Sequence, residues 1–568
     1  MNGSDSWIYL DDVPKENLKD YIGNGYRSCC YMIDHDRTGK IVLFGYDKSD
    51  NPAVFVFPWQ SHIKYNVKYR TAEQDLYGHF VETKYFKNSR DRNKYIENST
   101  GLNIVECLKP EQEALHYLFD SIVLTDNFNK QFLRTFFLDI ETEISDQFMK
   151  PAQAENRINM ITIFDTLTQK FYTWSLDHAE ISFKEEPLKN EPIDKFVFFE
   201  FSNDETKMLD HFVTWWENNY PDVVAGWNSQ AYDIPYIVRR LENVLGKSDT
   251  ARLSPVNKYF IKQVNHDNER SNVEAEIEVD IHGIFNADIL VLYRDKFHVR
   301  AALDGGYNLS NVGEVEKLGR KIEYNGTLKD LYLKDYQKFY EYNVRDVDLL
   351  KRIEDKCSLI PLARQICGFG LTNYGAIYSS ISYLIGSLIS FAKTEMSGKV
   401  FNSYLAKRHE FSGFEGAYVF PAMKSVVRGG VACIDFASLY PSTIRAVNAS
   451  PETFVGKVIA YRRDDTGNIT CNTNNDDPID IWDDNILTDK TIVKYELKLP
   501  SGTRKAITIP QIRELVKTKC IWTRNNTLFL KHEVKLGVLT RWCTHFYQLR
   551  KTIKKKMLSI GHKLHNEA

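Results

Sequence analysis

Several acidic residues of this chain stand where a strand or a helix would present them for metal chemistry. Asp139 and Glu141 lie two residues apart in the run 136–142, which we interpret as a buried strand. Residues two apart share one face of a strand, and two adjacent carboxylates repel each other unless a cation lies between them. The pair is therefore a candidate metal site, although Asp-x-Glu is also common on solvated strands.

Two further acids are expected on other elements. Asp233 lies in the segment 222–235, which we interpret as a transition from a strand to a loop, and a helix is predicted over 235–245. Tyr342 and Asp346 are four residues apart, so they share one face of a helix. Carboxylates that converge from separate elements can hold two divalent metals about 3.5–4 Å apart, which activate a water and stabilise a leaving oxygen.

A fifth acid, Asp435, ends the apolar run 431–434 and precedes the segment 438–444, Ser-Leu-Tyr-Pro-Ser-Thr-Ile. A carboxylate at the end of a buried strand is costly unless it is paired or binds a metal. The turn after it offers backbone amides to a polyphosphate, and Pro441 stands where a helix can begin. For a lone acid, an ordinary strand, turn and helix with a capping Asp is the alternative.

The C-terminal segment has a net positive charge, whereas the net charge of the whole chain is slightly negative. The net charge is −3, so any surface for nucleic acid must be local. From residue 541 on, seven Lys and Arg residues stand against one acid, Glu567. Arg550 and Lys554 share one face of the helix expected over 541–564. The planar guanidinium of an Arg and the point charge of a Lys together are suited to binding a triphosphate. A solvated basic helix is the alternative interpretation.

Composition indicates a globular protein of several domains. At 568 residues the chain is too long for one domain, and 43% hydrophobic residues allow sizeable cores. The nine cysteines include no Cys-x-x-Cys pair, which we interpret as reduced thiols. The N-terminus lacks the pattern of a signal peptide. The uncharged stretch 375–392 holds five serines, so we expect a buried helix there and no membrane segment.

Alternating patterns predict strands outside these motifs. Runs within 41–58 predict strands of an N-terminal α/β domain, and 62–70 alternates basic with apolar residues, which fits either a nucleic-acid face or a solvated one. The runs 259–264 and 273–280 flank a polar loop and predict a projecting β-hairpin. The Asp- and Asn-rich segment 462–485 does not have EF-hand spacing, so we interpret it as a solvated insertion.

Taken together, the motifs resemble those of the family B DNA polymerases of T-even-type phages. The segment 435–442, Asp-Phe-Ala-Ser-Leu-Tyr-Pro-Ser, is similar to motif A, and 447–453 narrows the resemblance to the phage enzymes. The acids at 139, 141, 233 and 346 are similar to the Exo I, II and III motifs of DnaQ-like 3′–5′ exonucleases. The segment 546–557 is similar to the first helix of the polymerase fingers.

The resemblance implies an α/β multidomain fold with four parts. These would be an N-terminal α/β domain over 1–134 with a return segment at about 359–405, an RNase H-like (DnaQ-like) exonuclease domain over 135–358, a partial palm over 406–530 and the first fingers helix over 531–568. In this family the predicted hairpin helps to separate primer from template.

The resemblance also implies roles for single residues of the exonuclease. Four acids would hold two Mg²⁺ or Mn²⁺ ions: Asp139, Glu141, Asp233 and Asp346. Tyr342 would hydrogen-bond the attacking water, and Asn228 and Tyr232 would contact the DNA end.

In the polymerase part, the resemblance implies that Asp435 holds the metals of nucleotidyl transfer. The residues that would bind the incoming dNTP are Ser438, Leu439, Tyr440, Arg550 and Lys554. Tyr440 would exclude a ribose 2′-OH. Gly416 lies in a segment similar to the Tyr-x-Gly-Gly linker motif and would let backbone approach a template phosphate. Phe414 replaces the tyrosine of that motif, which puts a hydrogen bond from its hydroxyl in doubt.

Two family motifs do not occur in the sequence: the Lys-x-x-x-Asn-Ser-x-Tyr-Gly type motif of the second fingers helix and the Tyr-Gly-Asp-Thr-Asp-Ser motif of the palm. We therefore expect primer extension to need a C-terminal polymerase chain, which would also contact a sliding clamp. A truncated fragment is the alternative. The expected substrates are primer-template DNA and dNTP, in the cytoplasm of a phage-infected bacterial host. A non-catalytic nucleic-acid-binding regulator and a free-standing 3′–5′ exonuclease remain open.

Overall fold

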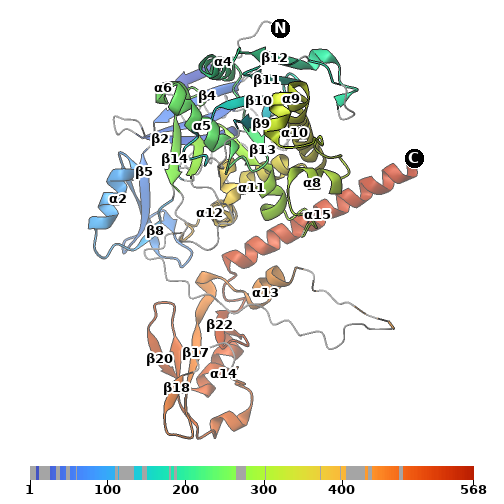
Figure 1. Cartoon of the computed structure of the whole chain (residues 1–568). Helices are drawn as coiled ribbons and strands as arrows, with labels where there is room; N and C mark the ends of the chain where they lie inside the picture. Colours follow the sequence, from blue (N-terminus) through green and yellow to red (C-terminus); the bar gives the residue numbers. More distant parts are fainter. Residues whose placement is uncertain are drawn as a thin grey trace. The chain divides into compact units, whose positions relative to one another are not determined.

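The structure is a computed structural model. It describes residues 8–11, 26–33, 39–46, 52–58, 60–108, 113, 133–143, 150–177, 179, 181–183, 188–263, 277–300, 302–370, 372–396, 398–403, 429–430, 432, 436, 438–471 and 478–567. The chain forms two compact units (Figure 1). The first comprises Met1–Ile63, Lys84–Gly101 and Leu108–Ser387, and the second comprises Lys64–Thr83, Leu102–Cys107 and Leu388–Ala568. Both units combine sheets with helices, which confirms the mixed α/β class. The four domain boundaries expected from the sequence stay a prediction.

The first unit is built on a six-stranded sheet in the order β12-β11-β10-β9-β13-β16. Its strands are β9 (Thr135–Thr142), β10 (Ile158–Asp165), β11 (Lys170–Ser175), β12 (Phe196–Glu200), β13 (Val223–Gly226) and β16 (Phe285–Asp288). β10 pairs antiparallel with β9 and β11, and the other pairings are parallel. The strand predicted over 136–142 is therefore confirmed as β9, an interior strand of the sheet.

The side chains of β9 alternate between two apolar cores, one on each face of the sheet. Helices therefore cover both faces. Phe136 and Leu138 belong to a core shared with α4 (Glu205–Glu217) and α5 (Asp233–Val244). Phe137 belongs to the opposite core, which contains residues of the long helix α10 (Tyr336–Cys357). Asp139 and Glu141 have the parity of Phe137, so they lie on the α10 face.

The remaining helices of the first unit are short. They are α2 (Ser89–Asn98), α6 (Lys247–Ala251), α7 (Ile289–Val291), α8 (Leu309–Val315), α9 (Leu328–Lys334) and α11 (Leu359–Gly370), with 3₁₀ turns at Ile193–Lys195 and Tyr374–Tyr378 and a π-turn at Leu292–Lys296. Thr327 begins α9 with a capping box to Asp330, which satisfies two backbone N–H groups that a helix start leaves unpaired. The irregular segment between α8 and α9 contributes to the site described below.

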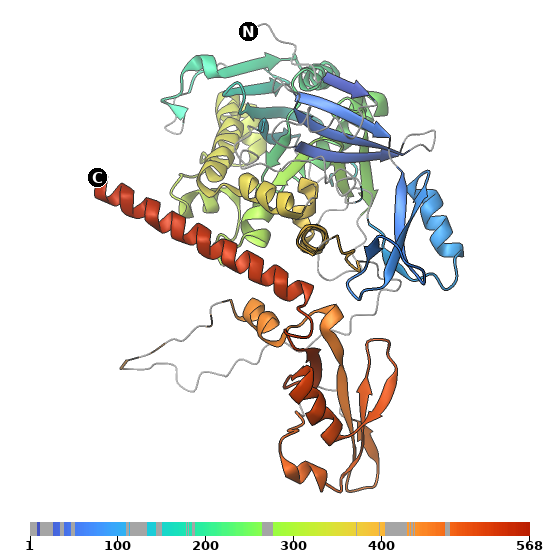
Figure 2. The same cartoon turned by 180° about the vertical axis from the view of Figure 1, so that it is seen from behind.

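The predicted hairpin strands are present as β14 (Tyr259–Gln263) and β15 (Ile277–Ile281), which pair antiparallel with Ile261 opposite Val279. The loop expected at its tip lies outside the described residues. A separate four-stranded sheet has the order β1-β4-β3-β2, with strands Ile8–Asp11, Tyr26–Ile33, Gly39–Tyr46 and Pro52–Pro58 in chain order. These strands are blue in Figure 2, and the last two confirm the strands expected within 41–58.

A further four-stranded sheet has the order β6-β7-β5-β8. Its strands are β5 (Ser61–Val67), β6 (Glu73–Gln74), β7 (Phe80–Phe86) and β8 (Ile104–Glu106). Helix α12 (Ser380–Glu395) covers most of the uncharged stretch and buries Ile389 and Ala392. After it, the backbone N–H of Val400 donates to the carbonyl of Gln74 at 2.9 Å. This contact agrees with a return of the chain to its N-terminal region.

The C-terminal part of the second unit contains a sheet in the order β20-β19-β17-β22-β21, with β18 beside β17. Its strands are β17 (Phe454–Arg463), β18 (Ile469–Cys471), β19 (Ile492–Lys498), β20 (Arg504–Ile507), β21 (Cys520–Trp522) and β22 (Thr527–Leu530). Its helices are α13 (Leu439–Val447), a 3₁₀ turn at Pro451–Thr453, a second at Asp484–Leu487, α14 (Ile509–Thr518) and α15 (Val538–Glu567). The described part of the expected insertion 462–485 includes β18, all three residues of which are exposed.

None of the helices in the described residues has the length and apolar character needed to cross a lipid bilayer.

Candidate active site

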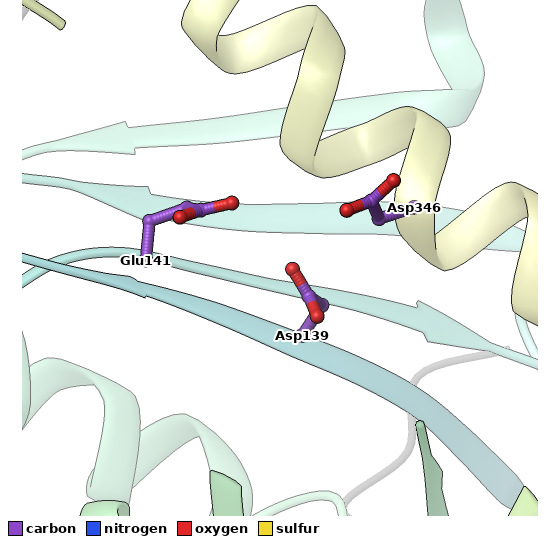
Figure 3. Close-up of side chains that lie close together, drawn as sticks. All are labelled: Asp139, Glu141 and Asp346. Atoms are coloured by element: carbon purple, nitrogen blue, oxygen red, sulfur yellow. The ribbon is translucent and has the colours of Figure 1, made fainter. Parts of the chain in front are cut away.

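Three acidic side chains from two elements converge on the α10 face of the central sheet. Asp139 and Glu141 come from β9, and Asp346 comes from α10. One carboxylate oxygen of each lies within 4.8 Å of the others, and Figure 3 shows the three carboxylates turned toward a common space. Glu141 and Asp346 are buried, and Asp139 is half-buried. The geometry is that of a small, oxygen-lined cage.

Local structure explains why these residues meet. Asp139 and Glu141 share a face because the strand alternates, and antiparallel pairing with β10 places Thr162 opposite Asp139. On α10, Asn343 lies one turn before Asp346, and its side-chain amide donates to Asp139 Oδ2 at 2.7 Å. The helix is therefore tied to the strand directly at the cage.

Burial and like charge make this arrangement of carboxylates unfavourable unless a cation offsets it. Burial raises the pKa of Asp139 well above its ordinary value, and Asp346 and Glu141 raise it further. Burial and the neighbouring Asp346 raise the pKa of Glu141 to about 8. Carboxyl groups held this closely bind protons or a cation to offset their repulsion.

The donor set fits a divalent cation. Asp346 Oδ1 and Asn343 Oδ1 are buried and make no hydrogen bond to any described group. Buried oxygens of this kind are normally satisfied by a donor, a water or an ion. Carboxylate and amide oxygens are ligands suited to Mg²⁺ or Mn²⁺. The cage therefore has both the ligand type and unsatisfied acceptor capacity that such an ion needs.

Asp233, the fourth expected acid, is buried near the cage but does not belong to the group within 4.8 Å. It is the first residue of α5, so the helix begins two residues earlier than the sequence predicted. It still helps to raise the pKa of Asp139, and burial raises its own pKa to about 7. Beside it, the hydroxyl of Tyr232 is 3.3 Å from that of Thr142 on β9.

A buried carboxylate that sequence reasoning did not assign a role holds the loop before Asp233. Asp288, at the end of β16, accepts hydrogen bonds from the backbone N–H of Asn228 and of Gln230, both at 3.1 Å. Asn228 itself is exposed and has a positive φ of 68°, which asparagine tolerates better than most residues. Asp288 thus fixes the backbone on which the Asn228 side chain is presented to solvent.

A lysine that the sequence analysis missed stands at the cage. Lys321 Nζ donates to Asp346 Oδ2 at 2.5 Å and to the hydroxyl of Tyr342 at 3.1 Å. Burial alone would lower the pKa of Lys321, but Asp346 and Tyr342 raise it above its ordinary value, so the ammonium stays charged. The sequence around Lys321 has neither a helical nor a strand pattern, and no spacing rule connects Lys321 with Asp346.

The residues expected to bind the incoming nucleotide lie at the start of α13 and on α15, where the structure describes them. Asp435 and Gly416 lie outside the described residues, so their roles stay predictions. Ser438 begins α13 with a positive φ of 55°, and Leu439 and Tyr440 are exposed by 51% and 77%. Arg550 and Lys554 are exposed on α15, whose range contains the helix predicted over 541–564. In the described part of the chain, the one group of acids close enough to hold an ion is the cage above.

Comparison with protein families gives two matches. The exonuclease domain of DNA polymerase family B matches residues 104–312, which contain Asp139, Glu141 and Asp233. DNA polymerase family B itself matches residues 385–567.

Curated relatives and a solved structure agree with these matches. The chain is 28% identical over 397 residues to the DNA-directed DNA polymerase of Escherichia phage RB69, covering 67% of this chain and 42% of that protein. It is 26% identical over 412 residues to the enzyme of Enterobacteria phage T4, covering 70% and 44%. The chain thus spans less than half the length of these relatives. The family B DNA polymerase from the hyperthermophilic archaeon Pyrobaculum calidifontis shares the fold, with a TM-score of 0.60 and 14% identity over 94% of this chain and 64% of that one.

Proposed function

Since the chain carries the exonuclease domain and a polymerase region of DNA polymerase family B, we propose that its first unit is a 3′–5′ exonuclease that removes nucleotides from DNA ends. The observation that carries this proposal is the largely buried cage of Asp139, Glu141 and Asp346. Such a cage has no evident structural purpose, because buried like charges destabilise a fold unless a cation offsets them.

Three acids of this chain would hold the metal ions, with Asp233 as an additional buried acid beside them. Two divalent cations, Mg²⁺ or Mn²⁺, would supply an activated water and charge stabilisation at the leaving oxygen when bound. Asn343 orients the Asp139 carboxylate through its hydrogen bond. Asp288 presents the loop with Asn228, which we propose contacts the terminal nucleotide together with Tyr232.

Lys321 and Tyr342 form the second half of the proposed site. The ammonium of Lys321 adds positive charge where a phosphate would approach the cage, which strengthens binding of the charge that develops on phosphate oxygens. Because the Tyr342 hydroxyl accepts a hydrogen bond from Lys321, its own proton is available to another acceptor. We propose that this acceptor is the attacking water.

The direct test is digestion of a single-stranded oligonucleotide labelled at its 5′ end. With Mg²⁺ or Mn²⁺ we expect a ladder of products shortened from the 3′ end, and no products in EDTA. A phosphorothioate linkage at the 3′ end should delay the ladder, whereas one at the 5′ end should not. DNA binding that is unchanged by EDTA, with no digestion under either metal, would instead support a non-catalytic nucleic-acid-binding regulator.

For the polymerase region, we propose that primer extension uses Asp435 together with palm and fingers motifs that this sequence does not contain. The support is that the phage relatives are more than twice as long as the part matched here. A separate C-terminal polymerase chain would supply those motifs and the contact to a sliding clamp, in the cytoplasm of a phage-infected host.

This second proposal predicts extension only by the complemented enzyme. The chain alone, given primer-template DNA, dNTP and Mg²⁺, should not extend the primer. Addition of a chain that carries the second fingers helix and the later palm motif should restore extension, and Asp435→Ala should abolish it again. Extension by the chain alone would contradict the proposal. If the chain purifies from its source without a second polymerase chain bound to it, a free-standing exonuclease would be favoured.

A further inference from the structure

The position of Lys321 at the cage needs an explanation, because the segment that carries it is irregular. The segment 316–327 connects α8 with α9 and contains no regular helix or strand. A lysine on such a segment has a long, flexible side chain and would lose much conformational entropy when held at one place. Some other group must therefore restrain the backbone near Lys321.

Arg345 is that group. It precedes Asp346 on α10, and successive residues of a helix point about 100° apart, so it faces the segment while Asp346 faces the cage. Its Nη2 donates to the carbonyl of Leu318 at 3.1 Å, and its Nε donates to the carbonyl of Arg320 at 3.0 Å. These bonds hold the backbone immediately before Lys321 and three residues before it.

The guanidinium is itself held in place. Arg345 Nη1 donates to Asp348 Oδ2 at 2.5 Å, and both side chains are buried, with exposed fractions of 3% and 7%. Arg352 also pairs with Asp348, at 2.9 Å, from a more exposed position. A buried, paired guanidinium is a rigid fork that can bind two carbonyls at once.

Gly319, between the two bonded carbonyls, is shaped by this contact. Its φ is +95°, and a Cβ at this position would lie 2.6 Å from Arg345 Nη2. Glycine is therefore needed both for the backbone conformation and for the close approach of the guanidinium. On the other side of Lys321, the ring of Tyr324 meets that of Tyr342 edge-on at 5.5 Å, so the segment is fastened to α10 before and after the lysine.

We propose that Arg345 is a positioning residue of the exonuclease, which holds the backbone of residues 318–320 so that the Lys321 ammonium stays against Tyr342 and Asp346. This inference rests on the proposed nuclease function. Arg345 itself touches neither the cage acids nor the place where a phosphate would bind. Its charge does lower the pKa of Asp346, so a substitution that keeps this charge is needed to show the effect that passes through Lys321.

The test is a double-mutant cycle in the full chain. Arg345→Lys keeps the charge beside Asp348, but a single ammonium does not bond both carbonyls in the same geometry. We expect kcat/KM for digestion to fall by about 10- to 100-fold, because small misplacements of a reacting group reduce rates by about this much. In a Lys321→Ala background, Arg345→Lys should cause no further loss, because coupled positions are not additive. A loss that persists undiminished in that background would overturn the proposal.

Two matched controls separate positioning from general damage to the fold. Arg352→Lys keeps the second positive charge beside Asp348, so it should leave kcat/KM unchanged. Gly319→Ala should act like Arg345→Lys. Gly306→Ala imposes comparable backbone strain, because Gly306 has a φ of +78°, but no atom lies within 4 Å of the added Cβ. This variant should keep the wild-type kcat/KM. Equal losses in Gly306→Ala and Gly319→Ala would contradict the role of the Arg345 contact.

A second readout does not depend on activity. Lys321 places a positive charge on the cage, so releasing it should lower the dissociation constant for Mn²⁺, measured by calorimetry. Arg345→Lys and Lys321→Ala should both show this tighter binding, and the double variant should show no more than Lys321→Ala. If Mn²⁺ binding follows this pattern while no variant digests DNA, the proposed function fails and the positioning role stands. Unchanged Mn²⁺ binding and unchanged digestion in Arg345→Lys would overturn the positioning role alone.

Discussion

Replacement of both Asp139 and Glu141 by alanine is expected to reduce 3′–5′ digestion by about 10³-fold or more. These residues supply two of the three carboxylates of the cage. Bound metal ions contribute several kcal/mol of transition-state stabilisation in hydrolytic sites, and about 1.4 kcal/mol corresponds to tenfold in rate. The measurement is the initial rate of shortening of a 5′-labelled oligonucleotide, with single-turnover conditions separating chemistry from binding.

A control variant and a second observable sharpen this experiment. Asp194→Ala with Asp304→Ala removes two carboxylates from exposed positions of the same unit and should keep the wild-type rate. Mg²⁺ or Mn²⁺ should raise the Tm of the wild type, because a cation offsets the burial and the like-charge repulsion that raise the pKa of Asp139. The cage variant should lose this shift and should not be less stable than wild type in EDTA. Digestion that survives the double substitution would reject the assignment.

The largest effect on stability is expected at Glu316, at the end of α8. Its carboxylate is buried and accepts hydrogen bonds from Tyr293 at 2.7 Å and Arg300 at 3.0 Å, and Lys356 lies 2.8 Å away. Glu316→Gln removes the negative charge and leaves its cationic partners incompletely paired. The side chains of Arg300 and Lys356 are 48% and 44% exposed, so water can solvate them after the substitution. The loss is then that of hydrogen bonds to a charged group, about 1.5–3 kcal/mol, which should appear as a lower urea midpoint at pH 7.

The same carboxylate predicts the direction of an acid effect. Burial alone would raise the pKa of Glu316, but the bonds from Lys356, Arg300 and Tyr293 lower it from 4.5 to about 2. A carboxyl whose pKa is depressed by folding stabilises the protein fully above its unfolded pKa and loses that effect as the pH falls through the folded value. The difference in stability between wild type and Glu316→Gln should therefore be constant above about pH 4.5 and shrink toward pH 2.

A neighbouring residue provides the comparison for Glu316. Glu314 is on the same helix and pairs with Arg320, but its side chain is 49% exposed. Exposed pairs contribute about 0–1 kcal/mol, so Glu314→Gln should barely move the urea midpoint. A loss in Glu314→Gln as large as in Glu316→Gln would show that charge removal from α8, and not the buried network, sets the stability.

Those parts of the site that depend on local periodicity could be predicted from the sequence. Asp139 and Glu141 share a face because a strand alternates, and Tyr342 and Asp346 share a face because a helix repeats, whatever the tertiary fold. The strand β9 and the hairpin strands β14 and β15 followed from the same patterns and are confirmed. The mixed α/β class followed from the resemblance and is also confirmed.

The rest of the site depends on tertiary contacts that have no local signature. Lys321 reaches Asp346 across 25 positions of sequence, from a segment with no regular pattern. Asp288 has no local signature of its role, because it accepts the backbone N–H groups of a loop distant in sequence. Asp233 is buried as expected for a ligand, yet its distance from the other acids depends on how α5 packs.

One helix, α10, carries four groups of the site. They are one of the three cage acids, the amide that orients Asp139, the tyrosine beside Lys321 and the arginine that holds the segment with Lys321. Local opening of a protein occurs in cooperative segments whose free energies differ. A single opening event in this helix would thus disable every one of those groups together. Amide hydrogen exchange in residues 336–357 should consequently be a direct gauge of how much of the population is competent at any moment.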